Sequence, residues 1–270
     1  MSSSSLLQVK EFVELTNFLP NRGRDFHNTC FIAVVANLRH LLVPVRQQTC
    51  QRTWIELVNF VRQEMRDDQS NLLFSSYDGN GQHDAALLLS EFLNTAPWNT
   101  FGVRIRKMKY MACCEREEET FEPLTMIVLM LPPESGEYSL CTLIKNYEEA
   151  EEYDDLECDF CSVGGVKHYA PGRTAQSIYE GIDGKMVFRF NRYSDDDRRS
   201  DRILLDPSIV LANGECYNLE AILQHQGQSS AGGHYIIFVL VDGQWEKRDD
   251  ATVTRTNLEY EPSNVQRIGT

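Results

Sequence analysis

The stretch that decides the fold is residues 217–253, YNLEAILQHQGQSSAGGHYIIFVLVDGQWEKRDDATV. Residues 217–224 and 235–241 carry the apolar, β-branched and aromatic side chains of buried strands, and a Gly/Ser-rich link separates them. Asp242 and Gly243 form a tight-turn signal. The sequence therefore predicts a hairpin around this turn.

The predicted hairpin places a histidine and a carboxylate at the same end. From Trp245 the chain is expected to run back antiparallel, so Asp249 returns beside His234. A histidine base and a carboxylate that orients it are two members of a nucleophilic catalytic site. The nucleophile must then come from a distant part of the sequence.

The composition limits the class of protein and the kind of partner to which such a site can belong. A chain of 270 residues with 42% hydrophobic and 10% aromatic content can bury a large core, as one domain or as two lobes sharing a cleft. The net charge of -14, from 26 Lys+Arg and 40 Asp+Glu, argues against nucleic-acid binding and favours a neutral or basic partner. Eight irregularly spaced cysteines indicate reduced thiols rather than a disulfide framework.

The N-terminal residues predict no membrane attachment or export. Residues 1–20 read as a tail and lead-in without the apolar core of a signal peptide. Nothing in the sequence approaches the roughly 18 to 20 apolar residues of a membrane span. We therefore expect a protein of the cytoplasm, the nucleus or both, without a membrane partner.

Cys30 is the candidate nucleophile. Apolar residues recur with helical spacing at 31, 34, 35, 38, 41 and 42, so Cys30 is predicted to lie in the first turn, with Thr29 or Asn28 as the N-cap. The unpaired amides at a helix start lower the pKa of a thiol there. A lone cysteine at this place is more often a structural core residue. The distant His234 reverses that preference.

Seven short motifs occur in a fixed order along the chain. They are Asn28-Thr29-Cys30-Phe31, Gln82-x-Asp84-Ala85, Lys185 to Tyr193, Tyr217 to Gly227, Gly232-Gly233-His234-Tyr235, Trp245 and Asp249-Asp250. Taken together, these boxes resemble the ubiquitin-specific protease family, from about residue 21 to residue 256. The resemblance implies an α+β, papain-like cysteine protease fold in a compact version, as one catalytic domain over residues 21–270. It further implies a thumb (about 21–98), fingers (about 99–184) and a palm (about 185–270).

The resemblance also implies the chemistry. The chain would hydrolyse the isopeptide or peptide bond after the C-terminal Gly-Gly of ubiquitin, with Cys30 as nucleophile, His234 as general base and acid, and Asp249 as orienting carboxylate. Asp250 is the alternative orienter, and a solvated turn is the other interpretation of this acidic pair. Ubiquitin or ubiquitinated proteins are the implied partners, catalysis needs no cofactor, and we expect a monomer.

Further family positions fall on residues expected to contact the ubiquitin tail. Gln82 and Asp84 open a predicted helix, and a carboxylate suits the arginines of that tail. Asp84 can also be a first-turn residue favoured by the helix dipole. Gly232 and Gly233, beside Tyr235, let a peptide backbone pass closely, although a glycine-rich hairpin connection explains them too.

The oxyanion site departs from the family pattern. Asp25 stands where the family has an asparagine, and an ionised carboxylate cannot donate a hydrogen bond. Asp25 could be protonated, the amide of Cys30 with Asn28 or another donor could form the site, or catalysis could be weak. The alternatives to a deubiquitinase are therefore a weak or inactive ubiquitin-binding adaptor, a protease for a ubiquitin-like modifier, and a zinc-stabilised interaction module.

A zinc site in the fingers is the less favoured interpretation. Cys158 and Cys161 form one Cys-x-x-Cys knuckle, but the upstream pair is the adjacent Cys113-Cys114. Adjacent side chains seldom converge on one tetrahedral ion, so three sulfurs are expected, with His168 as a fourth ligand if a metal binds. The sequence favours a degraded site whose strands hold the fold unaided.

Overall fold

The computed structural model describes residues 30, 34–35, 84–95, 102–182, 185–194, 197–199, 201–229, 232–250, 252–257 and 265–269. The labelled helices are α4 (Ala85–Thr95) and α5 (Leu140–Tyr147). The strands are β1 (Gly102–Met111), β2 (Arg116–Leu124), β3 (Ile127–Met130), β4 (Glu137–Ser139), β5 (Glu151–Glu157), β6 (Tyr169–Ile182), β7 (Met186–Asn191), β8 (Tyr193–Ser194), β9 (Asp197–Arg198), β10 (Arg202–Leu204), β11 (Ser208–Val210), β12 (Cys216–Ser229), β13 (Gly232–Val241), β14 (Gln244–Asp249), β15 (Thr252–Thr256) and β16 (Val265–Gly269).

The largest sheet has eight strands. Its order is β15-β14-β13-β12-β16-β7-β3, with β11 paired to β12. Within it, β3 runs parallel to β7, and the other pairings are antiparallel. The predicted hairpin is confirmed as β13, a turn at Asp242-Gly243 and β14, since both turn residues have positive φ, at 50° and 77°. Strand β12 lies on the other side of β13, as the run from 217 to 224 predicts.

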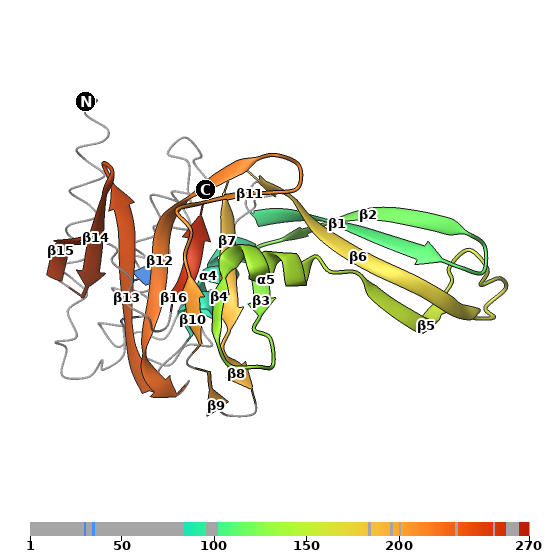
Figure 1. Cartoon of the computed structure of the whole chain (residues 1–270), viewed down its shortest axis with the longest axis horizontal. Helices are drawn as coiled ribbons and strands as arrows, with labels where there is room; N and C mark the ends of the chain where they lie inside the picture. The colour runs from blue at the N-terminus through green and yellow to red at the C-terminus, as the bar shows by residue number, and fades with distance from the viewer. Residues whose placement is uncertain are drawn as a thin grey trace.

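A second sheet projects from the first as an elongated arm (Figure 1). We call it the arm sheet; its four antiparallel strands are ordered β2-β1-β6-β5. Basic side chains of β1 pair across it with acidic ones of its neighbours, as in Arg106–Glu119 and Arg104–Glu180. These pairs are exposed, so each contributes at most about 1 kcal/mol. The acidic strand β5 is mostly exposed to solvent.

The main described core lies between the large sheet, α5 and the base of the arm. Ser139 caps α5, since its hydroxyl accepts a hydrogen bond from the Thr142 amide at 3.0 Å. The buried residues of α5, Leu140, Leu143 and Ile144, share one hydrophobic core with residues of both sheets. The core side chains include Val103, Ile105, Ile127, Leu129, Leu140, Leu143, Ile178, Phe188 and Phe190.

One predicted element is divided between the sheets. A single buried strand is suggested by the apolar run from Leu124 to Leu131, but Leu124 ends β2 in the arm sheet and Ile127 begins β3 in the large one. The run therefore crosses from one sheet to the other. Periodicity could not indicate this because both ends of the run are apolar.

Across the described residues, no helix is long and apolar enough to cross a membrane.

A buried ionic knot joins the loop after β9 to the loop between β3 and β4. The Asp201 side chain is 1% exposed and accepts hydrogen bonds from two nitrogens of Arg199, at 2.8 and 2.9 Å. The backbone amide of Gly136 donates to the same carboxylate at 2.7 Å. Arg199 also donates to the carbonyls of Leu131 and Glu134. One arginine thus ties together two segments about 65 residues apart in sequence.

Removing the Asp201 charge should destabilise the fold. Burial by itself raises the pKa of Asp201, but Arg199 and the Gly136 amide outweigh it and lower the pKa. We expect Asp201→Asn to lower the free energy of unfolding by about 3 kcal/mol, because it leaves a buried guanidinium unpaired. Chemical denaturation measures this loss. Asp155→Asn, on exposed β5, is the matched control and should stay within about 0.5 kcal/mol. Equal effects of the two substitutions would show that the knot adds no net stability.

Candidate active site

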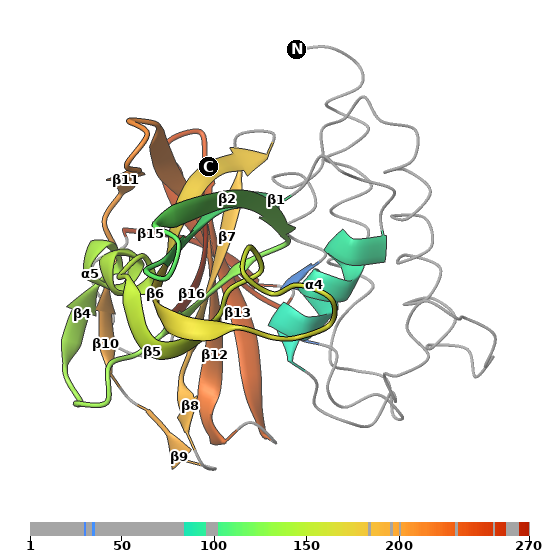
Figure 2. The same ribbon diagram turned by 90° about the vertical axis from the view of Figure 1, so that its right-hand side faces the viewer.

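Cys30 lies in a buried helical segment. Cys30, Val34 and Val35 all have helical backbone and are 2–3% exposed, which agrees with the predicted helical spacing. Figure 2 shows this short segment, drawn in blue, on the same side of the large sheet as α4. The candidate N-caps Asn28 and Thr29 lie outside the described residues.

His234 and Asp249 are brought together by the pairing of β13 with β14. The register sets Ile237 opposite Arg248, so Asp249 lies diagonally across from His234 on the neighbouring strand. His234 Nε2 donates a hydrogen bond to Asp249 Oδ1 at 2.7 Å. The predicted juxtaposition of histidine and carboxylate is present in the structure.

The electrostatics of His234 connect it to Cys30 as well. A hydrogen bond with the Cys30 side chain is the largest cause that raises the pKa of His234, to about 9. Partial burial lowers this pKa, whereas Asp249 and the nearby charge of Asp250 raise it. Burial also opposes ionisation of Asp249, but His234 and Lys247 outweigh that effect and lower its pKa. His234 thus lies between a thiol and a carboxylate.

Two charged neighbours complete the surroundings of this pair. Lys247 Nζ lies 3.4 Å from Asp249 Oδ2, a contact that the sequence analysis missed. Lys247 and Asp249 are two apart in β14, so strand alternation puts them on one face and could have indicated the contact. Asp250 follows β14 with a φ of 50°, and its part as alternative orienter stays a prediction.

Gly233, directly before His234, lies against a second histidine. Gly233 has a φ of 156°, and a Cβ atom there would meet His225 Nε2 at 2.4 Å and the Gln226 carbonyl oxygen at 2.6 Å. Tyr235 is 7% exposed and packs on His225, with ring centroids 4.6 Å apart. Only glycine fits at position 233, so the backbone beside His234 is held close to the His225 ring.

Asp84 caps helix α4. Its Oδ1 accepts a hydrogen bond from the Ala86 amide at 2.7 Å, and its carbonyl accepts the first helical bond from Leu88. Its Oδ2 accepts from Arg189 Nη2 in β7 at 2.5 Å. Arg189 was not a candidate in the sequence analysis, although a charged residue inside an apolar strand is a signal for it. The neighbouring candidate Gln82 lies outside the described residues, as does Asp25.

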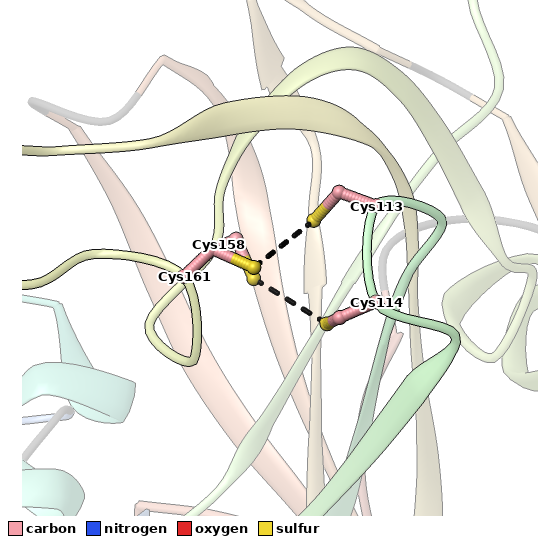
Figure 3. Close-up of side chains that lie close together, drawn as sticks. All are labelled: Cys113, Cys114, Cys158 and Cys161. Atoms are coloured by element: carbon pink, nitrogen blue, oxygen red, sulfur yellow. Dashed lines mark hydrogen bonds between the residues drawn. The ribbon is translucent and has the colours of Figure 1, made fainter.

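The four cysteines of the arm sheet converge at one point (Figure 3). Cys113 and Cys114 lie in the turn between β1 and β2, and Cys158 and Cys161 lie in the loop after β5. Sulfur pairs 113–161 and 114–158 are 3.8 and 3.7 Å apart, and all four atoms lie within 4.8 Å of one another.

The expectation that three sulfurs would converge is wrong. The adjacent pair occupies a four-residue turn, where successive side chains do not alternate between two faces as they do in a strand. Glu115 in that turn has a φ of 54°. His168, the expected fourth ligand, is exposed and is not part of the cluster. Its backbone carbonyl instead accepts a hydrogen bond from the Cys158 amide at 2.8 Å.

The thiols of this cluster are suited to bind a soft divalent metal. Burial would raise the pKa of Cys158, but hydrogen bonds with the Cys161 amide and the other three thiols lower it to about 7. The pKa of Cys113 is raised to about 12 by burial and by its contacts with the other thiols, and that of Cys161 is raised by its contact with Cys158, so Cys158 is the thiol that ionises first. For a zinc–sulfur bond of about 2.3 Å, the sulfurs of a tetrahedral site are about 3.8 Å apart. The two measured sulfur distances agree with that spacing.

Comparisons with known proteins identify the family of the chain. The family model described as ubiquitin carboxyl-terminal hydrolase matches residues 4–266. Ubiquitin carboxyl-terminal hydrolase 11 of Schizosaccharomyces pombe is 27% identical over 164 residues, which cover 56% of this chain and 45% of that protein. The chain therefore spans less than half the length of this relative.

Two solved structures resemble the fold. A chain of the SAGA Ubp8/Sgf11/Sus1/Sgf73 DUB module bound to ubiquitin aldehyde superposes with a TM-score of 0.67 at 16% identity, covering 93% of this chain and 68% of that one. A chain of the same module bound to monoubiquitin gives 0.64 at 15% identity, covering 100% and 76%. The predicted α+β fold of the ubiquitin-specific proteases is confirmed, whereas the boundaries of thumb, fingers and palm stay a prediction. With its family model matched over almost the whole sequence, the chain belongs to the ubiquitin carboxyl-terminal hydrolase family.

Proposed function

We propose that the chain is a thiol-dependent deubiquitinase, which hydrolyses the bond after the C-terminal Gly-Gly of ubiquitin. One observation carries the proposal: the His234 ring interacts with the Cys30 side chain and also hydrogen-bonds Asp249 at 2.7 Å. A nucleophile, a base and an orienting carboxylate in contact are the requirements of covalent acyl transfer. These groups come from distant parts of the sequence.

Each residue has a defined step in the proposed mechanism. Because His234 Nε2 is engaged by Asp249, Nδ1 is the nitrogen left for the Cys30 thiol. The thiolate attacks the carbonyl of the terminal glycine, and the imidazolium gives its proton to the leaving lysine amine. Water, deprotonated by the neutral imidazole, then hydrolyses the thioester. Asp249 keeps the ring oriented throughout and stabilises its charged form.

The proposed partner is ubiquitin, free or attached to other proteins, and its tail would contact residues from several elements. We call Gln82, Asp84, Gly232, Gly233 and Tyr235 the proposed tail-binding surface. The structural relatives carry ubiquitin aldehyde or monoubiquitin, which supports this partner. Since Tyr235 is 7% exposed, its part would be to support His225 and the glycine backbone from below.

The oxyanion site decides how fast the proposed reaction runs. The backbone amide of Cys30 is the donor that a nucleophile near a helix start supplies itself, whereas Asp25 cannot donate when ionised. Losing one donor typically lowers the rate by about 10² to 10³. The presence of Asp25 in place of the family's asparagine favours the second candidate function, which is an adaptor that binds ubiquitin with little turnover.

A ubiquitin probe with a C-terminal electrophile tests the proposal. We expect the probe to label the unchanged chain covalently and not to label Cys30→Ala. Mass spectrometry of the intact protein measures the labelling. Cys216→Ala, an exposed cysteine outside the site, is the control and should label normally. Binding of the probe without labelling would favour the adaptor. A chain that neither labels nor binds would contradict both functions.

The pH dependence should report the pKa of His234. Since that pKa is raised to about 9, the imidazolium that protonates the leaving amine persists to that pH, and kcat/KM on an isopeptide-linked substrate should fall above it. The shift also contributes stability that is full below about pH 6.5 and is lost as the pH rises through about 9. Asp249→Asn should move the alkaline fall to lower pH. An alkaline limb at the same pH in Asp249→Asn would show that Asp249 does not hold the proton of His234.

We further propose a structural zinc at the four-cysteine cluster. Cys113, Cys114, Cys158 and Cys161 would hold it through their thiolates and so cross-link the two loops at the tip of the arm sheet. The cluster lies beside the small local core of Met111 and Ala170, which gives little burial of its own. No step of the proposed catalysis uses this metal.

Elemental analysis of the purified chain tests the metal. We expect one zinc per chain, its loss in Cys158→Ser, and its retention in Cys216→Ser. The free energy of unfolding should fall in the first variant and not in the second. A chain purified without zinc that also fails to take it up from solution would contradict the proposal, as would full retention in Cys158→Ser.

A further inference from the structure

The carboxylate of Asp84 is already engaged within the chain. Its two oxygens accept hydrogen bonds from the Ala86 amide at 2.7 Å and from Arg189 at 2.5 Å. The side chains of Asp84 and Arg189 are each 25% exposed, so water screens the pair only in part. A carboxylate whose charge is balanced in this way offers little attraction to a further cation.

Two rigid elements hold the pair in place. Asp84 is fixed as the cap of α4, and Arg189 is fixed by its position in the middle of β7. Its neighbours Phe188 and Phe190 are buried in the main core, so Arg189 projects from the opposite face of the strand. The ion pair therefore belongs to the packing of α4 against the large sheet and does not depend on a loop.

The surface around the pair is apolar. Leu87, one helical turn after Asp84, is 52% exposed. Val128, which pairs with Arg189 in the neighbouring strand β3, is 41% exposed, and Met130 on the same face is 62% exposed. Two of these exposed apolar side chains therefore lie on the face of the sheet that carries Arg189, and the third lies on the helix that Asp84 caps. Such a surface offers apolar contacts to an extended peptide and little net charge.

We infer that Arg189 is a specificity-determining residue of the proposed tail-binding surface. By balancing the charge of Asp84, it removes most of the preference for an arginine in the bound tail and leaves recognition there to the apolar side chains. The inference rests on the proposed function. It assigns Asp84 a smaller contribution to binding than the family resemblance implies, because that resemblance has this carboxylate attract the arginines of the tail.

The test measures binding of free ubiquitin, and of ubiquitin in which the tail arginines are replaced one at a time by glutamine, by calorimetry. For the unchanged chain we expect each replacement to weaken binding less than about threefold. In Arg189→Gln, at least one replacement should weaken it about tenfold, because Asp84 is then free to bind the arginine. Arg189→Lys keeps the charge and should behave like the unchanged chain.

A second variant covers the case in which Arg189→Gln fails to fold. In Asp84→Asn the replacements should weaken binding no more than in the unchanged chain, because the balanced carboxylate contributes little and Arg189 is then left without its counter-charge. Equal sensitivity in Arg189→Gln and the unchanged chain would overturn the inference alone. So would an unchanged chain in which a replacement weakens binding about tenfold and in which Asp84→Asn removes that effect. An unchanged chain that binds no ubiquitin would overturn the proposed function and the inference with it.

Discussion

The hydrogen bond between His234 and Asp249 is the interaction on which the site depends, and backbone pairing fixes it. Asp242 and Gly243 set the turn, the ladder between β13 and β14 sets the register, and the register sets which side chains meet. A slip of one residue would turn Asp249 to the other face of the sheet. The position of the carboxylate is therefore determined by all the hydrogen bonds of the hairpin together.

Steric fit on the other side of β13 restrains the same histidine. Gly233 lies so close to His225 that any side chain would collide with its ring, and Tyr235 packs on the ring from the next position. His234 lies between these two residues and cannot shift without disturbing one of them. The proposed role of His234 as a base would need this kind of support, because small displacements of a base lower the rate of proton transfer strongly.

The arm sheet is stabilised differently from the rest of the molecule. Its base joins the main core through Val103, Ile105 and Ile178, but its tip has only a small local core around Met111, Cys158 and Ala170. Exposed cross-strand ion pairs add little to such a sheet. A metal cross-link at the tip would supply the stability that so small an apolar core cannot provide. The convergence of four thiols there is consistent with such a cross-link.

The sequence by itself determined the elements whose signals are local. The turn at Asp242-Gly243, the flanking strands and the helical spacing after Cys30 follow from periodicity and turn chemistry, and the order of the boxes identified the family. Contacts between distant segments were decided only by the tertiary structure. The ion pair of Asp84 with Arg189 and the closure of four cysteines depend on which elements pack together and on how a turn directs adjacent side chains. Neither leaves a periodic signal in a single sequence, because the partners are separated by tens of residues.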